Sequence, residues 1–340
     1  MSINDMSIND LSINHSPFEQ AQAVMSVNPI RRFCARLALA ITTWLCLSVS
    51  QLALADTWQH ERGSISFDSP PQRVVALNWA ATEALALLGV TPVGVADLEY
   101  YKVWVQDPAL PEGVANVGAR SAPSLEAISE LAPDLIVTSG QLAPAYEQLA
   151  AIAPTYVISV YDEGTQPYQQ ARTMLTTLAQ MLDRESRAET VLADIDATLA
   201  DNRARLEAAG LTDRPVAIVG FMDDRHVRIN TPNGLLQAGI EGLGLTNAWQ
   251  REGNFWGFSL VGLEELAPLQ QARLVAISPT PPGLKDQLAG SPFWKHLPMV
   301  RQNQVYQIDP VWTFGGVHSV RRLANTLTEQ LLSGGSDNVR

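Results

Sequence analysis

Residues 73–97 read RVVALNWAATEALALLGVTPVGVAD. The apolar run at residues 74–77 predicts a buried strand. Residues 80–88 then carry apolar side chains at helical spacing, and Gly89 comes next as a residue that commonly ends a helix. Residues 92–96 form a second short apolar run. A strand, a helix and another strand in this order indicate a βαβ unit with two parallel strands.

The same alternation of strands and helices continues to about residue 160. Each expected strand is short and apolar, and the expected helices begin near prolines and serines, which suit a helix start. The expected elements are a helix at 123–131 capped by Ser121 or Ser124, a strand at 134–138, a helix at 144–151 and an extended segment at 155–159.

A helical region separates this N-terminal part of the chain from the C-terminal part. Apolar residues at helical spacing cover residues 167–182 and again residues 185–209. The second helix would be about 37 Å long at a rise of 1.5 Å per residue. That length fits a strut between two lobes and fits an ordinary surface helix equally well.

The fold class expected is α/β, because the strand and helix pattern returns after the helical region. The later expected strands lie at 215–219, 273–277 and 305–308, and the later helices at 234–242, 263–266, 292–297 and 317–332. The predicted parts are an N-terminal lobe at 56–166, a helical segment at 167–210 and a C-terminal lobe at 211–340.

Residues 1–55 are typical of an export signal peptide with an N-terminal extension. Arg31 and Arg32 precede an uncharged apolar run at 37–49, and Ala53-Leu54-Ala55 is a small-x-small cleavage signature. We expect cleavage after Ala55 and a periplasmic protein. An uncleaved anchor remains an alternative, and the arginine pair leaves open whether export uses the general or the twin-arginine route.

The composition excludes several classes of function. The net charge of -12 argues against a nucleic-acid binder, which would carry a basic surface. Both cysteines, Cys34 and Cys46, lie in the predicted signal peptide, so the mature chain would have no disulfide and no thiol nucleophile. The sequence has no G-x-S-x-G, P-loop or H-E-x-x-H motif, and we expect no catalytic residues.

The histidines do not indicate a metal site. Those that would remain after cleavage are scattered, and none has an acidic partner at ligand spacing, so no metal ligand is predicted. They are His60, His226, His296 and His318. The acidic pair Asp223-Asp224 stands beside Arg225 and Arg228, which we interpret as a turn with local charge pairing.

Aromatic residues beside turn signals are the strongest sign of a binding site. Trp104, Trp256, Trp312 and Phe314 stand in predicted loops flanked by glycine or proline, where aromatic side chains suit a pocket wall better than a core. Arg120 stands just before a predicted helix. In a pocket lined by aromatic rings, its guanidinium could hold ligand oxygens with two parallel hydrogen bonds.

Several motifs together resemble the iron-siderophore binding proteins of ABC importers. They are RVVALNW at 73–79, LGV at 88–90, PVGVAD at 92–97, VGAR at 117–120, PSLE at 123–126 and LAPDLI at 131–136. Further motifs resemble the ferric hydroxamate (ferrichrome-type) members: YKVWV at 101–105, NAWQ at 247–250, NFWG at 254–257 and PVW at 310–312. The resemblance covers about residues 72–332.

The resemblance implies two Rossmann-like lobes joined by a single long helix, the class III periplasmic binding protein fold, with the ligand in the cleft between the lobes. It implies that Trp104, Arg120, Trp256 and Trp312 line the pocket, with Phe314 where the ferrichrome-type protein has tyrosine. One departure is Leu142, which stands where the family has a ligand-binding tyrosine. Gln141 and Tyr146 are nearby and could substitute for it.

The function implied is capture of a ferric hydroxamate-type siderophore and delivery to an inner-membrane ABC permease with its ATPase. Iron would be bound only as the ferric siderophore, without another cofactor, by a monomer that binds no nucleic acid. Glu126 and Glu264 would dock one lobe each on the permease, although spacing alone favours a helix N-terminal charge for both. The alternatives are another iron chelate, cobalamin or haem on the same fold, and an exported hydrolase.

Overall fold

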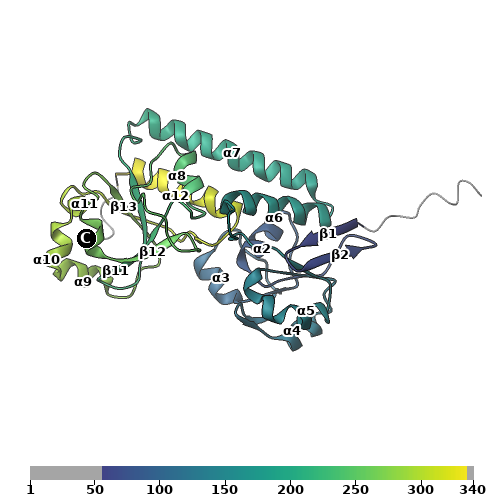
Figure 1. Cartoon of the computed structure of the whole chain (residues 1–340). Helices are drawn as coiled ribbons and strands as arrows, with labels where there is room; N and C mark the ends of the chain where they lie inside the picture. Colours follow the sequence, from purple (N-terminus) through teal and green to yellow (C-terminus); the bar gives the residue numbers. More distant parts are fainter. Residues whose placement is uncertain (1–55, 335–340) are drawn as a thin grey trace, which may run out of the picture. The chain divides into compact units, whose positions relative to one another are not determined.

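A five-stranded sheet stands at the centre of each half of the chain in the computed structural model, which describes residues 56–334 (Figure 1). The signal peptide and cleavage site predicted within residues 1–55 lie outside the described residues. None of the helices within 56–334 is both long enough and apolar enough to span a bilayer.

The sheet of the N-terminal lobe is parallel throughout, as the βαβ pattern predicts. Its strand order is β5 (Ala115–Asn116), β4 (Gly94–Val95), β3 (Val74–Ala76), β8 (Leu135–Thr138) and β9 (Thr155–Val157). Its helices are α2 (Trp79–Leu87), α3 (Leu98–Trp104), α4 (Leu125–Glu130), η1 (Gly140–Ala145) and α5 (Tyr146–Ala150). Two small hairpins complete the lobe, β1 (Asp56–His60) with β2 (Gly63–Phe67) and β6 (Gly118–Ala119) with β7 (Ala122–Pro123).

The sheet of the C-terminal lobe is mixed. Its order is β12 (Phe258–Gly262), β11 (His226–Asn230), β10 (Val216–Phe221), β13 (Arg273–Ile277) and β14 (Val305–Ile308). The last three strands are parallel, and β11 is antiparallel to both of its neighbours. The helices are α8 (Gln237–Gly242), η2 (Leu263–Leu266), α9 (Leu284–Gly290), α10 (Pro292–His296), α11 (Pro298–Arg301) and α12 (Val317–Leu332).

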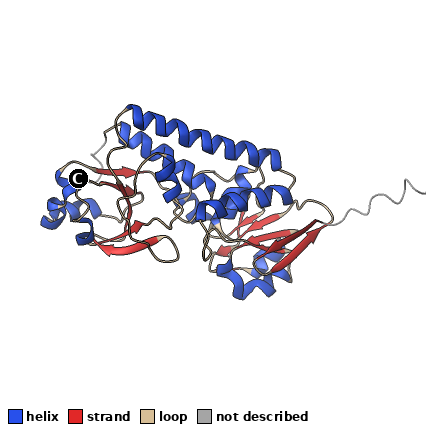
Figure 2. Ribbon diagram, turned by 45° about the horizontal axis from the view of Figure 1, so that its top comes forward, coloured by secondary structure: helices blue, strands red, loops and turns tan. Residues whose placement is uncertain are grey.

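A single long helix joins the two lobes. After α6 (Pro167–Met181), which packs on α2, the 24-residue α7 (Glu185–Ala208) runs past both sheets (Figures 1 and 2). Helix α7 packs against α6 of the first lobe and against α8 and α12 of the second. The strut interpretation of the second helical stretch is therefore confirmed.

The largest hydrophobic cluster of residues 56–334 extends through both lobes. It includes Val74 of the first sheet, Leu175 of α6, Ile195 of α7, Val216 of the second sheet and Leu323 of α12, each completely buried. Burying apolar surface is the main favourable term in folding, so the contact between the lobes is stabilised in the same way as each lobe's own interior.

A buried carboxylate fastens the lobes at the N-terminus of α12. Glu83 of α2 is 1% exposed, and its two carboxylate oxygens accept hydrogen bonds from the His318 backbone N–H (2.7 Å) and the Ser319 hydroxyl (2.9 Å). The N-cap of α12, Gly316, has no side chain to bond these donors. Glu83 therefore caps a helix of the other lobe, where a negative charge also suits the helix dipole.

Burial raises the pKa of the Glu83 carboxyl, and the positive field of His318 and the hydrogen bonds from α12 oppose that rise. The surroundings of the Glu83 carboxylate thus provide a hydrogen-bond donor for each of its two oxygens and shield it from solvent. Removing the carboxylate would leave those buried donors without an acceptor, and such a loss costs about 1–3 kcal/mol for each donor.

We expect Glu83→Ala to lower the free energy of unfolding by about 3 kcal/mol or more, because two buried donors lose their acceptors. Urea unfolding followed by circular dichroism measures it. Glu83→Gln keeps one acceptor oxygen and should lose less. Glu126→Ala is the matched control, since Glu126 is exposed in the first turn of α4 and should change stability by only about 0.5 kcal/mol. Equal stability of Glu83→Ala and Glu126→Ala would contradict the capping role.

One sequence interpretation is wrong at the level of local structure. Trp104 is the last residue of helix α3 rather than part of a loop. The aromatic and β-branched residues of α3 have weak helix propensity, and the segment is anchored by buried Tyr101, whose hydroxyl donates to the Pro108 carbonyl. The turn with local charge pairing expected at Asp223-Asp224 is confirmed through Arg225 and His226, while Arg228 lies in β11 and takes no part in it.

Candidate functional site

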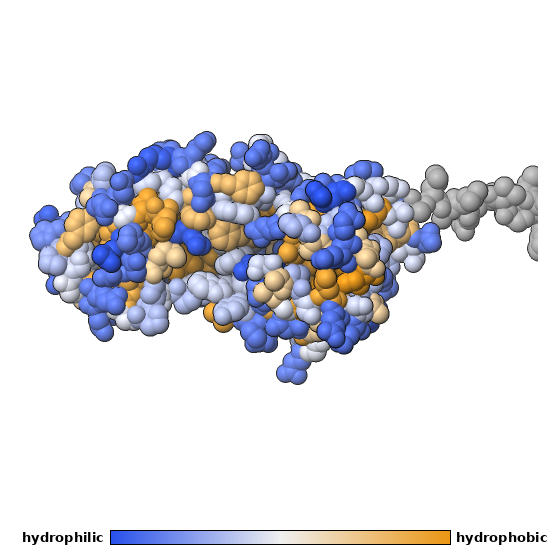
Figure 3. Space-filling view, turned by 60° about the horizontal axis from the view of Figure 1, so that its bottom comes forward, coloured by the Kyte–Doolittle hydropathy of each residue, from blue (hydrophilic) through white to orange (hydrophobic). Residues whose placement is uncertain are grey.

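A cavity of about 700 Å³ lies between the lobes. The N-terminal lobe contributes residues that directly follow β3, β4, β8 and β9, where the carboxyl ends of parallel strands meet at one edge of the sheet. The C-terminal lobe contributes aromatic side chains from loops and from β12. In the space-filling view, apolar surface gathers in the recess between the lobes, with hydrophilic residues around it (Figure 3).

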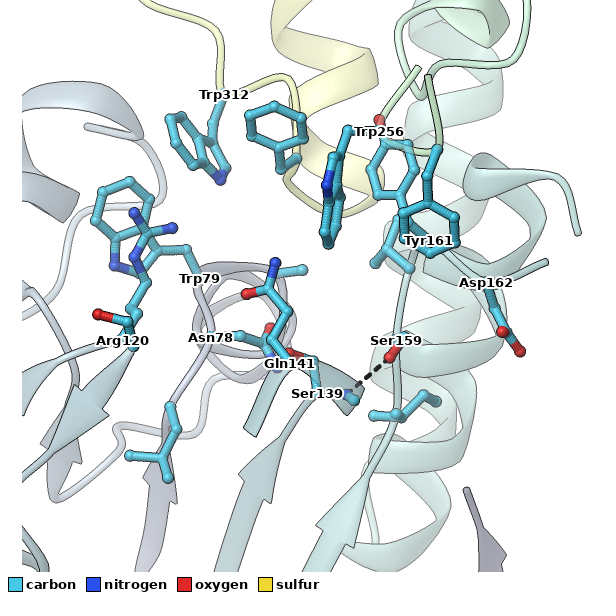
Figure 4. A pocket seen from close by; sticks show the side chains of 18 of the residues that line it. Asn78, Trp79, Arg120, Ser139, Gln141, Ser159, Tyr161, Asp162, Trp256 and Trp312 are labelled. Carbon is cyan, nitrogen blue, oxygen red and sulfur yellow. Dashed lines mark hydrogen bonds between the residues drawn. The ribbon is translucent and has the colours of Figure 1, made fainter. Parts of the chain in front are cut away.

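Arg120 is held in a fixed position in the first lobe's wall. Its Nε donates to Asp97 Oδ2 at 3.1 Å, and its backbone N–H donates to the same oxygen at the same distance. Its guanidinium carbon lies 3.6 Å from the centroid of the Trp79 ring, a cation–π contact. Within the described residues the two terminal nitrogens of Arg120 have no hydrogen-bond partner, so they remain available to a ligand (Figure 4).

Asn78 and Trp79 lie beside this arginine at the start of α2. The Asn78 side chain caps the helix by accepting the Ala81 N–H at 2.8 Å, while its buried Nδ2 has no partner among the described residues. Trp79 donates its indole N–H to the Ala96 carbonyl at 3.0 Å. Its ring is 4.6 Å from that of Trp312, so an aromatic contact crosses the cleft.

A cluster of rings forms the opposite wall. Trp256 lies 6.0 Å from Phe314 and 5.7 Å from Tyr161, and Trp312 lies 5.2 Å from Phe314 (Figure 4). The Tyr161 hydroxyl donates to the Thr313 carbonyl at 2.9 Å and accepts the Leu235 N–H at 3.0 Å. Burial raises the pKa of Tyr161, so this hydroxyl stays neutral and holds the rings in place.

The turn that carries Trp256 depends on a close approach of two chain segments. Gly257 has a φ of +69°, and a Cβ on it would lie 2.2 Å from the Gly234 Cα. The Gly257 carbonyl accepts the Thr231 N–H at 3.1 Å, and Asn254 Oδ1 accepts the Trp256 N–H at 3.0 Å. Only glycine fits position 257. The close contact with Gly234 makes the turn rigid, and Trp256 therefore stands on a rigid turn.

The structure brings together most of the side chains predicted for the pocket. Those that line the cavity are Arg120, Gln141, Trp256, Trp312 and Phe314. Trp104 lies behind this lining, with its ring 6.3 Å from that of Trp312. Tyr146 packs against His60 instead, at 5.8 Å between ring centroids.

The remaining predicted positions lie at the surface or below the cavity. Leu142 is 5% exposed and belongs to the core of the N-terminal lobe, so it presents no polar group to a ligand. Glu126 is exposed in the first turn of α4, where Ser124 provides the helix cap. Glu264 is exposed at the start of η2, a short 3₁₀ turn rather than the α-helix expected there.

Sequence reasoning missed Trp79, Asp97, Tyr161 and Arg228 as parts of the cavity wall. A usable signal existed for the first two, because both directly follow predicted strands at the edge where parallel strands end. Tyr161 and Arg228 gave no local signal, since their positions depend on how the lobes meet.

The residues that line the cavity are suited to binding a small-molecule ligand. Its polar groups are guanidiniums, amides, hydroxyls and carboxylates, and the residues from 56 to 334 contain no cluster of three or more His, Cys, Asp or Glu that could hold a metal ion. Aromatic faces can bury an apolar ligand shell, while the guanidinium and amide N–H groups can donate to its oxygens.

Residues 74–311 match the family described as periplasmic binding protein. The iron(3+)-hydroxamate-binding protein FhuD of Escherichia coli K12 is 36% identical over 261 residues, which cover 76% of this chain and 87% of the relative. The Fe(3+)-citrate-binding protein YfmC of Bacillus subtilis is 28% identical over 278 residues, and this match covers 80% of this chain and 84% of the relative.

Among solved structures, the chain is similar to the siderophore-binding protein FhuD of Vibrio cholerae with bound Fe³⁺-Desferal. The TM-score is 0.74 at 32% identity, and the match covers 78% of this chain and 99% of that one. Coverage of this extent agrees with the two-lobed architecture. The chain therefore belongs to the periplasmic binding protein family, and its relatives there include proteins that bind iron siderophores.

Proposed function

We propose that the protein is a periplasmic solute-binding protein that captures a ferric hydroxamate-type siderophore in the inter-lobe cavity and delivers it to an inner-membrane ABC importer. The observation that carries the proposal is a fixed guanidinium, Arg120, set among the rings of Trp79, Trp256 and Trp312. The family of this chain contains solute-binding proteins rather than enzymes. The hydroxamate-binding relatives of the chain support this choice of ligand.

The physical match concerns both charge and surface. A ferric tris-hydroxamate is close to neutral and wraps iron in a carbon shell, so it needs apolar walls and a few hydrogen-bond donors. A ferric catecholate carries several negative charges and would favour several unpaired cations. Because Asp97 balances the charge of Arg120, this ion pair offers N–H donors to a ligand with little net charge of its own.

Iron would be held entirely by the siderophore. We expect the purified protein to release all iron when the ferric siderophore is displaced by excess iron-free siderophore and dialysis, because no ligand cluster for iron occurs within the described residues. Iron analysis by atomic absorption measures this. Stoichiometric iron retained after complete siderophore removal would contradict the expectation.

We predict that Arg120→Ala weakens ferric hydroxamate binding at least tenfold, since a hydrogen bond involving a charged group contributes about 2–3 kcal/mol. Quenching of intrinsic tryptophan fluorescence during titration with ferric ferrichrome measures the affinity. Arg62→Ala is the control, because Arg62 is exposed on the turn between β1 and β2 and does not line the cavity. Unchanged affinity in Arg120→Ala would refute the proposed site.

Docking on the permease would use one exposed glutamate from each lobe. We predict that the double charge reversal Glu126→Arg with Glu264→Arg abolishes siderophore-dependent iron uptake while soluble binding stays within about twofold, since neither residue lines the cavity. Uptake by cells and fluorescence titration of the purified protein separate the two effects. Loss of soluble binding would assign these residues to folding instead.

A further inference from the structure

Arg228 is a second guanidinium in the cavity wall, on the opposite lobe from Arg120. On β11 its neighbours Val227 and Ile229 are fully buried in the lobe, so the alternation of a strand sends the Arg228 side chain to the other face. There its guanidinium carbon lies 4.5 Å from the Phe258 ring centroid and 5.7 Å from that of Phe314.

No carboxylate of the described residues forms an ion pair with this guanidinium. Asp223 accepts the backbone N–H groups of Arg225 and His226, and Asp224 lies 4.0 Å from Arg225. Among residues 56–334 no hydrogen bond or ion pair reaches the side chain of Arg228, and its Nε is buried without a partner. Burial lowers the pKa of Arg228, yet a guanidinium remains protonated at neutral pH.

The two arginines of the cavity therefore differ in kind. The charge of Arg120 is balanced by Asp97 at 3.1 Å, whereas Arg228 has no ion-pair partner within residues 56–334 and its side chain is partly shielded from water. An unpaired cation in such a place is unfavourable until an anion meets it. The free forked donors of a guanidinium match the two oxygens of a carboxylate.

Two further carboxylates, those of Glu61 and Asp162, line the cavity on the N-terminal lobe. Both residues are exposed, so water screens their repulsion of an anion. Glu61 also accepts the Ser159 hydroxyl at 3.1 Å. They do not compensate Arg228, because no ion pair joins them to it within the described residues.

We propose that Arg228 forms an anion subsite on the C-terminal lobe, and that the preferred ligand is a ferric hydroxamate chelate that carries a free carboxylate. This inference rests on the proposed function and specifies its ligand class. Arg120 would donate to oxygens at the iron centre, while Arg228 would bind the carboxylate on the periphery of the chelate.

Three derivatives of one ferric chelate test the proposal. Ferrioxamine B has an ammonium tail, its acetylated form has a neutral tail, and its succinylated form ends in a carboxylate. We expect the protein to bind the succinylated form about tenfold more tightly than the acetylated form, and the ammonium form no more tightly than the acetylated one. Tryptophan quenching gives the three dissociation constants.

The variant Arg228→Leu should bind the acetylated and succinylated forms with affinities within about twofold of each other, because the cation that distinguishes them is gone. Arg228→Lys should keep part of the preference, since it retains the charge without the fork. The matched control is Arg225→Leu, three residues away, exposed and outside the cavity, which should keep the full preference. Far-UV circular dichroism and melting temperature verify that each variant is folded.

The outcomes separate this inference from the proposed function. Equal affinity of the unmodified protein for the acetylated and succinylated forms, or a preference that survives in Arg228→Leu, overturns the anion subsite alone. Tighter binding of the ammonium form does the same and would assign recognition to Glu61 and Asp162. If the protein binds none of the three chelates, nor ferric ferrichrome, the proposed function itself fails.

Discussion

The carboxylate of Glu83 at the N-terminus of α12 is the interaction on which the cleft depends. It ties α2, whose first residues form one cavity wall, to α12, which directly follows the loop carrying Trp312 and Phe314. Further contacts add to this tie: Arg322 of α12 donates to Gln106 at 2.8 Å, and the Tyr161 hydroxyl bonds Thr313 and Leu235 of the C-terminal lobe. The two aromatic walls are thereby held at a defined separation.

Preorganisation results from this arrangement. Arg120 is already stacked and paired before a ligand arrives, and Trp256 stands on a glycine-constrained turn, so binding orders few side chains. A site of this kind loses little conformational entropy on binding. Arg228 differs from them, since no carboxylate of residues 56–334 pairs with it, and the proposed anion subsite would make the C-terminal lobe the wall where ligand charge matters.

Local patterns predicted most of the fold. The strand at 273–277 and the helix at 317–332 agree with the structure residue for residue, and α7 differs at one end by a single residue. The hairpin β1–β2, strands β11 and β12 and helix α3 were missed, because their polar or aromatic residues are fixed by contacts across the fold. The site also divides into residues that local patterns predicted and residues that depend on the fold. The resemblance of motifs located Arg120 and Trp256, whereas the position of Arg228 depends on which face of β11 meets the cleft.

The core that passes from β3 through α7 to α12 also bears on how the protein resists proteases. Two lobes that shared no apolar core could open one at a time and present unfolded chain to proteases. Here Val74, Ile195 and Leu323 belong to one buried cluster, so local loss of either lobe exposes apolar surface of the other. Unfolding should therefore be a single cooperative event, and resistance to proteolysis would depend on the stability of the whole chain.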